Sequence, residues 1–451
     1  MSLSDLNELI RYPELNKAHL RYDSIQPIID ELKHTGMMTH RVAGYSFEKR
    51  PINLFTVGTG NLVIFAWSQM HGDEATATAS LLDLLRIVHD MTQTDEGNQS
   101  PFALDKNFLT RITLHVLPML NPDGAELMIR HNAQSIDINR DAVALQSPEG
   151  RLLRELIEQL KPSIAFNLHD QSPYYQCGTT GNPATIAFLA PAFDAQKSVD
   201  LPRQRAMALI GHLSESISRY IPNKVARYDD TFSARSFGDC IAGFGASTVL
   251  IESGAHPDDP NRQIARALNT FALLHTINMF CDSNEQQAIS LSQRYEDAYW
   301  QIPENKKDRL CSLLIKNVSF ANGAYEADVS VIQTARYSNM FVVNEIGDLS
   351  VLGALAYFDA SSFSYQSGNP YILRNKLVLN SVLYLGLLSQ GYSHFVGDES
   401  LLIVQTDYDV LLNPRFYHSN RALRLSAPAF GLFEQSGQIK HALLNGKILS
   451  L

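Results

Sequence analysis

Four short apolar segments recur along the first two thirds of the chain, and each ends in a cluster of polar side chains. They span residues 62–67, 112–120, 163–168 and 248–251. Runs of this kind are typical of strands buried in a sheet, whereas the leucines that follow the first segment have helical spacing. Because strands and helices alternate, the sequence predicts an α/β fold with a doubly wound sheet.

The polar clusters after these segments lie where a ligand site is expected. His71 and Glu74 follow the first segment, and Asn121 lies at the end of the second. His169 directly follows the third segment, and Glu252 follows the fourth. In a doubly wound sheet the carboxyl ends of the strands line the ligand crevice. The four clusters are therefore expected to converge on one edge of the sheet.

His71 and Glu74 are three residues apart, at the point where a strand gives way to a helix. An imidazole and a carboxylate at this spacing can both bind one metal ion. A catalytic zinc takes three protein ligands from His, Asp and Glu and keeps one position open for water. A zinc hydrolase is one hypothesis, and two polar residues at the exposed start of a helix would give the same short pattern.

Five motifs together give the sequence a recognisable form. They are His71-x-x-Glu74, Asn121-Pro-Asp-Gly124, Asp137-Ile-Asn-Arg140, His169 and Glu252-Ser-Gly254. In this order they resemble the zinc carboxypeptidase family, over roughly residues 40–280. The resemblance implies a mixed α/β sheet flanked by helices, one zinc ion per chain, and hydrolysis of the C-terminal peptide bond of peptides.

The resemblance also implies roles at the metal. Zinc would be held by His71, Glu74 and His169, with Glu252 as general base and acid. Zinc can lower the pKa of a bound water to about 7 and polarise a carbonyl oxygen. A carboxylate beside that water can take its proton and return it to the leaving amine.

For the substrate, the resemblance implies that Asn139 and Arg140 hold the terminal carboxylate, because an arginine fork binds a carboxylate through two parallel hydrogen bonds. Arg130 would polarise the scissile carbonyl and stabilise the developing oxyanion. Tyr228 is the nearest candidate for the tyrosine that the peptidases place on a mobile loop before the catalytic glutamate. Asp239, near the family's specificity position, favours basic or amino-bearing side chains.

Two other functions remain open at this point. Gly72 and Asp73 give a His-Gly-Asp-Glu form that resembles the bacterial-type branch of the zinc carboxypeptidases. The form is nearly shared with the succinylglutamate desuccinylase and aspartoacylase branch, whose substrates are N-acyl amino acids. The Asn121-Pro-Asp-Gly124 motif is more typical of the peptidases and favours peptides. A catalytically silent binding protein on the same fold is the third hypothesis, although the predicted ligands and base are all present.

Several acidic residues near the motifs have a structural explanation as well. Asp170 can orient a metal ligand or cap the following turn. Asp123 is expected to fix the turn of its own motif. Asp137 is expected to orient Asn139 and Arg140 rather than contact the substrate.

Composition limits the class of protein. Of the 451 residues, 45% are hydrophobic and 19% charged, so the chain can bury a large core. The net charge of -10 contains no block of like charges, which argues against nucleic acid or an anionic membrane as partner. The four cysteines show no metal or disulfide spacing. We find no secretory signal and no apolar run that approaches the ~18 residues of a membrane span, so we expect a cytoplasmic protein. The sequence carries no signal for the oligomeric state.

The sequence predicts three regions: a helical extension at residues 1–40, the catalytic domain at 41–283, and an accessory domain of mixed β character at 284–451. The last region contains shorter β-like runs and a hairpin signal at Asn445-Gly446. Candidate strands there are 309–320, 325–332, 341–351 and 401–405, and an amphipathic helix is expected at 376–388. The accessory domain is expected to shape access, oligomerise or bind substrate rather than to carry chemistry.

Overall fold

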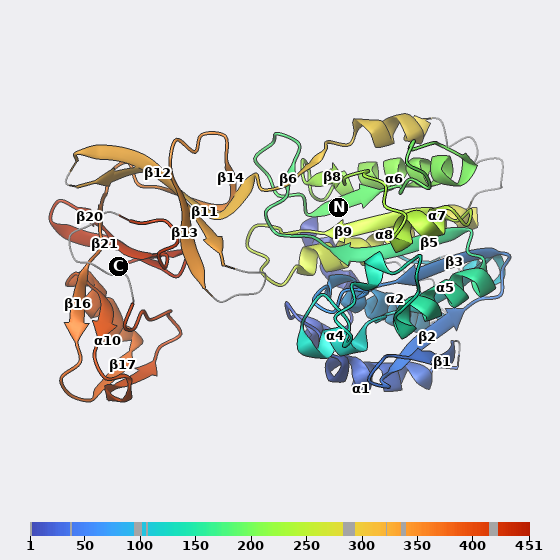
Figure 1. Cartoon of the computed structure of the whole chain (residues 1–451), viewed down its shortest axis with the longest axis horizontal. Coiled ribbons are helices and arrows are strands. Elements are labelled where there is room, and N and C mark those ends of the chain that lie inside the picture. Colours follow the sequence, from blue (N-terminus) through green and yellow to red (C-terminus); the bar gives the residue numbers. More distant parts are fainter. Residues whose placement is uncertain are drawn as a thin grey trace. The chain divides into compact units, whose positions relative to one another are not determined.

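The computed structural model describes residues 2–36, 38–93, 102–104, 107–282, 294–321, 323–334, 340–414 and 423–451. It divides into two compact units, Met1–Lys306 and Lys307–Leu451 (Figure 1). The predicted domain boundary between residues 283 and 284 lies outside the described residues.

The first unit is built on an eight-stranded mixed sheet with the order β1-β2-β4-β3-β5-β9-β7-β8. Its strands are β1 (Thr39–Tyr45), β2 (Pro51–Val57), β3 (Leu62–Trp67), β4 (Ile112–Leu117), β5 (Ile164–Asp170), β7 (Ile186–Leu189), β8 (Val225–Arg227) and β9 (Ser247–Ser253). The four central strands β4, β3, β5 and β9 are parallel, and they are the four apolar segments of the sequence. The predicted mixed α/β fold is therefore confirmed.

Helices cover both faces of this sheet. They are η1 (Leu3–Leu9), η2 (Pro13–Leu15), α1 (Tyr22–Lys33), α2 (Thr76–Gln93), α3 (Phe108–Arg111), α4 (Pro122–Leu127), η3 (Ile138–Arg140), α5 (Pro148–Leu160), α6 (Leu201–Ser218), α7 (Phe237–Ala242) and α8 (Gln263–Asp282). A short pair, β6 (Gln176–Cys177) with β10 (Asn305–Lys306), lies outside the main sheet. None of the helices that the structure describes is both long enough and apolar enough to span a membrane.

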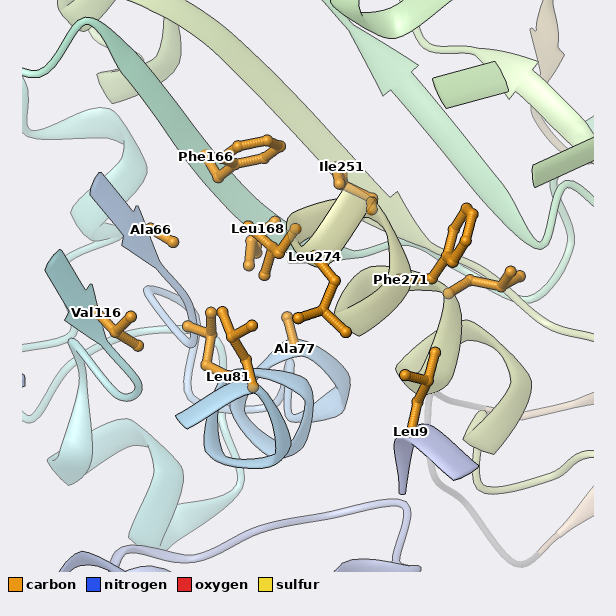
Figure 2. Packing of buried hydrophobic residues seen from close by; sticks show 14 of the residues in the cluster. Leu9, Ala66, Ala77, Leu81, Val116, Phe166, Leu168, Ile251, Phe271 and Leu274 are labelled. Atoms are coloured by element: carbon orange, nitrogen blue, oxygen red, sulfur yellow. The ribbon is translucent and has the colours of Figure 1, made fainter. Parts of the chain in front are cut away.

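The alternation of side chains along β5 decides which residues enter the core and which reach the site. Phe166 and Leu168 pack with α2, α6, α8 and the N-terminal helices (Figure 2). Ala165 packs on the opposite face, with α5 and α7. Successive strand residues point to opposite faces, so His169 shares the face of Ala165. Burial of Phe166 and Leu168 in the core stabilises the fold by about 1.5–3 kcal/mol for each side chain.

A buried ion pair fixes the N-terminal segment to this core. Arg266 donates from Nε and Nη2 to the Asp83 carboxylate, at 2.7 and 2.8 Å. Asp83 also accepts the backbone N–H of Arg11 and of Tyr12, and Arg266 donates to the Tyr12 carbonyl. Because both charges are buried and fully bonded, they connect helices α2 and α8 to the chain before α1.

The second unit is mainly β, as predicted. Its largest sheet has the order β13-β12-β11-β15-β20-β21-β22, and β14 pairs with β11. Its elements are β11 (Leu310–Phe320), β12 (Tyr325–Gln333), β13 (Phe341–Gly347), β14 (Gly353–Asp359), β15 (Ser364–Gln366), β16 (Asn369–Ile372), β17 (Leu377–Asn380), α10 (Ser381–Ser389), β18 (Tyr392–Val396), η4 (Glu399–Leu401), β19 (Leu402–Gln405), β20 (Phe430–Gln435), β21 (Gln438–Leu444) and β22 (Lys447–Ser450). The strand β16 pairs with β18, and β17 with β19.

The helix expected at residues 376–388 starts later than predicted. Residues Leu377–Asn380 form β17 and pair in parallel with β19, so their hydrogen bonds are used in a sheet. Asn380 then caps the helix, because its side chain accepts the N–H of Leu383. The expected hairpin at Asn445-Gly446 is confirmed: it joins β21 to β22 with positive φ at both residues, 48° and 82°.

Candidate metal centre

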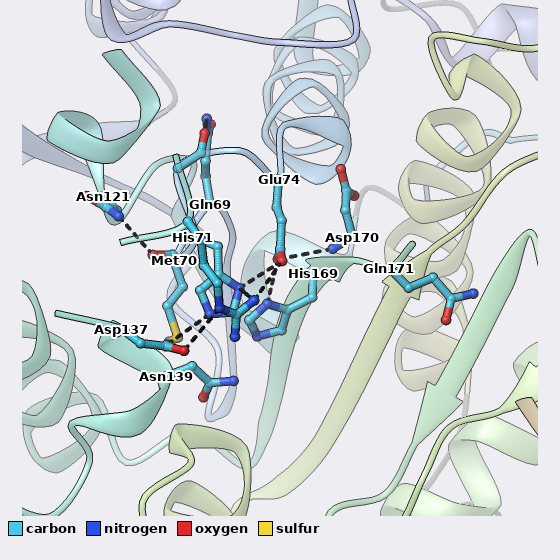
Figure 3. Close-up of polar contacts among 12 residues, drawn as sticks. Gln69, Met70, His71, Glu74, Asn121, Asp137, Asn139, His169, Asp170 and Gln171 are labelled. Atoms are coloured by element: carbon cyan, nitrogen blue, oxygen red, sulfur yellow. Dashed lines mark hydrogen bonds and ion pairs between the residues drawn. The ribbon is translucent and has the colours of Figure 1, made fainter. Parts of the chain in front are cut away.

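The three predicted metal ligands lie together at the carboxyl ends of β3 and β5. His71, Glu74 and His169 are all buried, and their ligand atoms lie within 4.8 Å of one another. His71 and Glu74 come from the loop between β3 and α2, whereas His169 is the sixth residue of β5. Figure 3 shows the two imidazoles converging on the Glu74 carboxylate.

The loop that carries His71 and Glu74 is fixed by the Asn121-Pro-Asp-Gly124 motif. Asn121 donates its backbone N–H to the Gln69 carbonyl and its Nδ2 to the Met70 carbonyl. A Cβ on Gly72 would lie only 1.9 Å from the carbonyl carbon of Gly124. Glycine at position 72 is therefore required for the two loops to pack, and the two motifs form one structural unit.

The donor atoms lie close enough together to hold one metal ion. Nδ1 of His71 lies 2.8 Å from Glu74 Oε1, and Nδ1 of His169 lies 2.8 Å from Glu74 Oε2. Both imidazoles thus direct the same type of nitrogen to one carboxylate. Two imidazoles and one carboxylate form a donor set found in catalytic zinc sites, so these residues fit the metal that the sequence predicts.

The charges at this centre depend strongly on one another. Burial opposes a charge on His71, yet the carboxylates of Glu74 and Asp137 outweigh it and raise the pKa of this imidazole to about 9. Burial lowers the pKa of His169. Burial also opposes ionisation of Glu74, but the two imidazoles hold its pKa well below the usual range. Glu74 is therefore a carboxylate at neutral pH.

The Asp137 carboxylate contacts two of the predicted site residues. Its Oδ1 lies 3.2 Å from Nε2 of His71, and its Oδ2 accepts a hydrogen bond from Nε of Arg130 at 3.0 Å. It was expected to orient Asn139 and Arg140. Its backbone carbonyl accepts the N–H of Arg140 at 2.9 Å, at the start of η3. A carboxylate on the far nitrogen of an imidazole fixes the orientation of the ring, so Asp137 orients His71 and Arg130 as well.

Asp170 contacts both the start of α2 and the metal group. Its Oδ2 accepts the N–H and the hydroxyl of Thr76, at 3.3 and 2.8 Å, and so caps the start of α2. Its backbone N–H donates to Glu74 Oε2 at 3.2 Å and orients that carboxylate. Asp123, in contrast, accepts from Ser46 and from the backbone of Glu48, which connects its turn to the loop between β1 and β2.

Glu252 lies beside His169. The two residues are register partners in the parallel strands β5 and β9, so their side chains leave the sheet on the same face.

Tyr228 follows β8 and donates its backbone N–H to the Phe188 carbonyl at 2.8 Å. The negative charge of Glu252, and then burial, raise the pKa of the Tyr228 phenol well above its usual value. The phenol is therefore close to the carboxylate of Glu252.

The predicted carboxylate anchor lies at the start of α7. Asn139 accepts the backbone N–H of Phe237 at 3.0 Å. Nη1 of Arg140 donates to the hydroxyl of Ser236 at 3.1 Å and to the Asn139 carbonyl at 2.8 Å. The Arg140 side chain is otherwise exposed. Arg130, the other predicted arginine, lies 3.6 Å from Glu74 Oε1 and is about two fifths exposed, at 39%.

Two carboxylates hold the segment between Tyr228 and α7. Nη2 of Arg203 donates to both oxygens of the Asp230 carboxylate, each at 2.9 Å. Asp239 accepts the backbone N–H of Ser233 at 2.7 Å, and burial raises its pKa to about 6. The first contact joins residues 27 apart in the chain, so no local spacing in the sequence announces it.

Comparisons with known proteins indicate a similarity to carboxypeptidases over part of the chain. A family model described as zinc carboxypeptidase matches residues 25–142. The probable carboxypeptidase 2 of Arthroderma benhamiae is 32% identical over 139 residues, which are 30% of this chain and 24% of that protein. Carboxypeptidase SOL1 of Arabidopsis thaliana is 27% identical over 110 residues, 22% of this chain and 21% of that protein. The chain thus spans about a quarter of the length of these relatives.

Among solved structures, a metallo-carboxypeptidase from Burkholderia cenocepacia is similar over 59% of this chain and 71% of its own, with 18% identity and a TM-score of 0.46. A putative carboxypeptidase A from Shewanella denitrificans is similar over 58% and 71%, with 17% identity and a TM-score of 0.46. The family match confirms the resemblance of the sequence to the zinc carboxypeptidases and places it on residues 25–142.

Proposed function

We propose that this protein is a zinc-dependent metallocarboxypeptidase that hydrolyses the C-terminal peptide bond of peptides. The observation that carries the proposal is the buried group of His71, Glu74 and His169, whose ligand atoms lie within 4.8 Å of one another. Glu252 lies level with His169 on the neighbouring strand. A metal site with a carboxylate beside it is the arrangement that hydrolysis by an activated water requires.

The chemistry divides among the residues as follows. Bound at this group, zinc would make a bound water acidic and polarise the scissile carbonyl. Glu252 accepts the proton of the attacking water and passes it to the leaving amine. Arg130 places a positive charge beside Glu74, where it can stabilise the oxyanion that develops from the carbonyl. Asp137 holds both His71 and Arg130 in position for these roles.

Recognition of a chain end is assigned to Asn139 and Arg140. Ser236 and the Asn139 carbonyl hold one guanidinium nitrogen of Arg140, so that the group is oriented before a substrate binds. An arginine that is exposed and oriented can bind a terminal carboxylate through two parallel hydrogen bonds. Tyr228 lies near Glu252 and completes the substrate side of the centre.

An N-acyl amino acid deacylase would use the same metal group and the same base. The sequence argument for it was the His-Gly-Asp-Glu form of the first motif. In the structure, Gly72 is required by its packing against Gly124, whatever the substrate. This glycine therefore no longer favours the deacylase, and the peptidase remains the better supported function.

The test is turnover by purified, zinc-loaded protein of three substrate sets: peptides with a free carboxylate, their amidated forms, and N-acyl amino acids. We expect cleavage of the free peptides, little cleavage of amidated ones, and loss of this preference in Arg140→Ala through a raised KM. A preference for N-acyl amino acids would indicate the deacylase. Zinc binding without turnover of any set would indicate a binding protein.

A further inference from the structure

The strands β5 and β9 set the distance between the third predicted ligand and the predicted base. His169 and Glu252 are register partners, and the ladder ends one residue later with Asp170 and Ser253. The N–H of Gln171 still donates to the Ser253 carbonyl at 2.9 Å. The reactive pair therefore lies within two residues of the point where the strands separate, and strand ends open more readily than strand centres.

One arginine bridges these two strand ends. Nη1 of Arg262 donates to the Ser253 carbonyl at 2.6 Å, and Nη2 donates to the Gln171 carbonyl at 2.8 Å. The residue is 8% exposed, so water screens these bonds little. The guanidinium is planar and rigid, so its two nitrogens hold the two carbonyls at a fixed separation. Arg262 thus continues the pairing of β5 and β9 beyond their last ladder position.

The same guanidinium is connected to the metal group through Asp170. Nη1 of Arg262 lies 3.9 Å from Asp170 Oδ2. That oxygen also accepts from Thr76, and the backbone N–H of Asp170 donates to Glu74. A displacement of Arg262 would therefore reach both the strand ends and the carboxylate at the centre of the site.

The backbone of Arg262 is held in an uncommon conformation. Its φ is 55°, in the left-handed region that a side chain with a Cβ disfavours. Its N–H donates to the Asp259 carbonyl, and the Asp259 carboxylate caps the start of α8 through Gln263 and Ile264. Such strain persists where the surroundings fix the residue. From this backbone the side chain of Arg262 reaches the carbonyls of both strand ends.

We propose that Arg262 is a positioning residue, a forked clamp that holds the strand ends carrying His169 and Glu252 at the separation that the reaction requires. The inference rests on the proposed hydrolytic function. Because the clamp acts on the transition state geometry and not on the substrate anchor, its loss lowers kcat and leaves KM nearly unchanged.

The test compares Arg262→Lys with Arg266→Lys. Both changes keep the charge of a buried arginine and remove its planar fork. The described hydrogen bonds of the Arg266 fork go to Asp83 and to the Tyr12 carbonyl, and none goes to the strand ends. We expect kcat of Arg262→Lys to fall about tenfold or more, with KM changed less than about threefold, whereas Arg266→Lys keeps kcat within about twofold. Equal values of kcat in the two variants would overturn the proposal.

A second measurement does not depend on turnover. In metal-free protein, the amide hydrogen of Gln171 should exchange slowly in the unchanged chain and about tenfold faster or more in Arg262→Lys, while amides of β3 and β4 stay the same. A Gln171 amide that already exchanges freely in the unchanged chain would overturn the clamp, even if the variant fails to fold. If the unchanged chain binds zinc but cleaves no substrate, the proposed hydrolytic function is refuted. The exchange rate of the Gln171 amide would then be the measurement that tests the clamp.

Discussion

At the scale of single residues, the charges around the predicted metal group alternate in sign. Asp137 lies between His71 and Arg130, and Glu74 lies between two imidazoles. Each buried carboxylate therefore has a donor or cation in contact, which is the condition under which burying charges is tolerated. The same contacts fix the orientation of the imidazole rings, so the centre is arranged by residues that need not touch a substrate.

If His169 is a metal ligand, His169→Ala should lose far more zinc affinity than the roughly 10–100-fold that removal of an outer partner removes. His115→Ala is the matched control, because His115 lies in β4 and contacts Thr56 instead of the metal group. Metal analysis and competition with a chelator measure the difference. Equal zinc affinity in the two variants would refute the ligand assignment.

The role of Glu252 is tested by a change that keeps its shape. Glu252→Gln cannot accept a proton from water, so kcat should fall by roughly 100-fold or more while zinc stays bound. Substrate should still bind, because Arg140 and Asn139 lie on other elements. Single-turnover kinetics on zinc-loaded protein measure this step, and a near-normal rate would assign the base to another residue.

The sequence predicted the residues of the metal group because the order of its five motifs resembles that of the zinc carboxypeptidases. His71, Glu74 and His169 could be named before the structure, and the structure brings them together. The contact of Asp137 with His71 was not predicted, because it spans 66 residues and depends on how two loops pack. Arg262 was not found, because a clamp made through backbone carbonyls leaves no pattern of side chains.

At the scale of elements, the buried strands were predicted well and the edges of elements less well. Each of β3, β4, β5 and β9 is a continuous apolar run, so its hydrophobicity alone identifies it. The segment 377–380 is equally apolar and continues into a helix, and only pairing with β19 separates the strand from α10. Pairing partners far apart in the chain cannot be identified from the spacing of apolar residues.

The segment that joins Tyr228 to α7 should respond to pH through Asp239. Burial raises the pKa of this carboxyl from 3.8 to about 6. A raised acid pKa contributes stability that is complete below pH 3.8 and is lost as the pH rises through about 6. Asp239→Asn should therefore gain stability over the unchanged chain between pH 4 and pH 7, by about 1–2 kcal/mol after allowance for solvent screening.

Denaturant unfolding of both proteins across this pH range measures the effect. Asn can still accept the N–H of Ser233, so the hydrogen bond is retained in the variant. Asp230→Asn is the contrasting change, because Asp230 is paired with Arg203 and its loss should destabilise the protein at neutral pH. A stability difference for Asp239→Asn that does not vary with pH would show that the carboxyl does not titrate as described.

At the scale of the whole molecule, the end of the first unit matters for the site. The chain between residues 294 and 306 returns to the sheet after α8. Tyr299 is fully buried, and its hydroxyl accepts the N–H of Ala190. The Pro303 carbonyl accepts the N–H of Arg227. Asn305 donates to the Gln171 side chain at 2.6 Å. Arg227 precedes Tyr228, and Gln171 is the residue that Arg262 clamps. This segment therefore belongs physically to the unit that carries the metal group.

A chain that ends at residue 306 should accordingly fold, bind one zinc ion and keep the environment of Tyr228, whereas a chain that ends at residue 283, the boundary expected from the sequence, should not. Loss of the buried Tyr299 side chain alone is expected to lower the free energy of unfolding by about 3–5 kcal/mol. This is a large part of the stability of an ordinary domain. Thermal unfolding and zinc stoichiometry of the two shortened chains measure the difference. The contacts of Arg227 and Gln171 predict that the shorter chain also loses order at the site itself. Equal stability and equal zinc binding in both would show that residues 294–306 merely connect the two units.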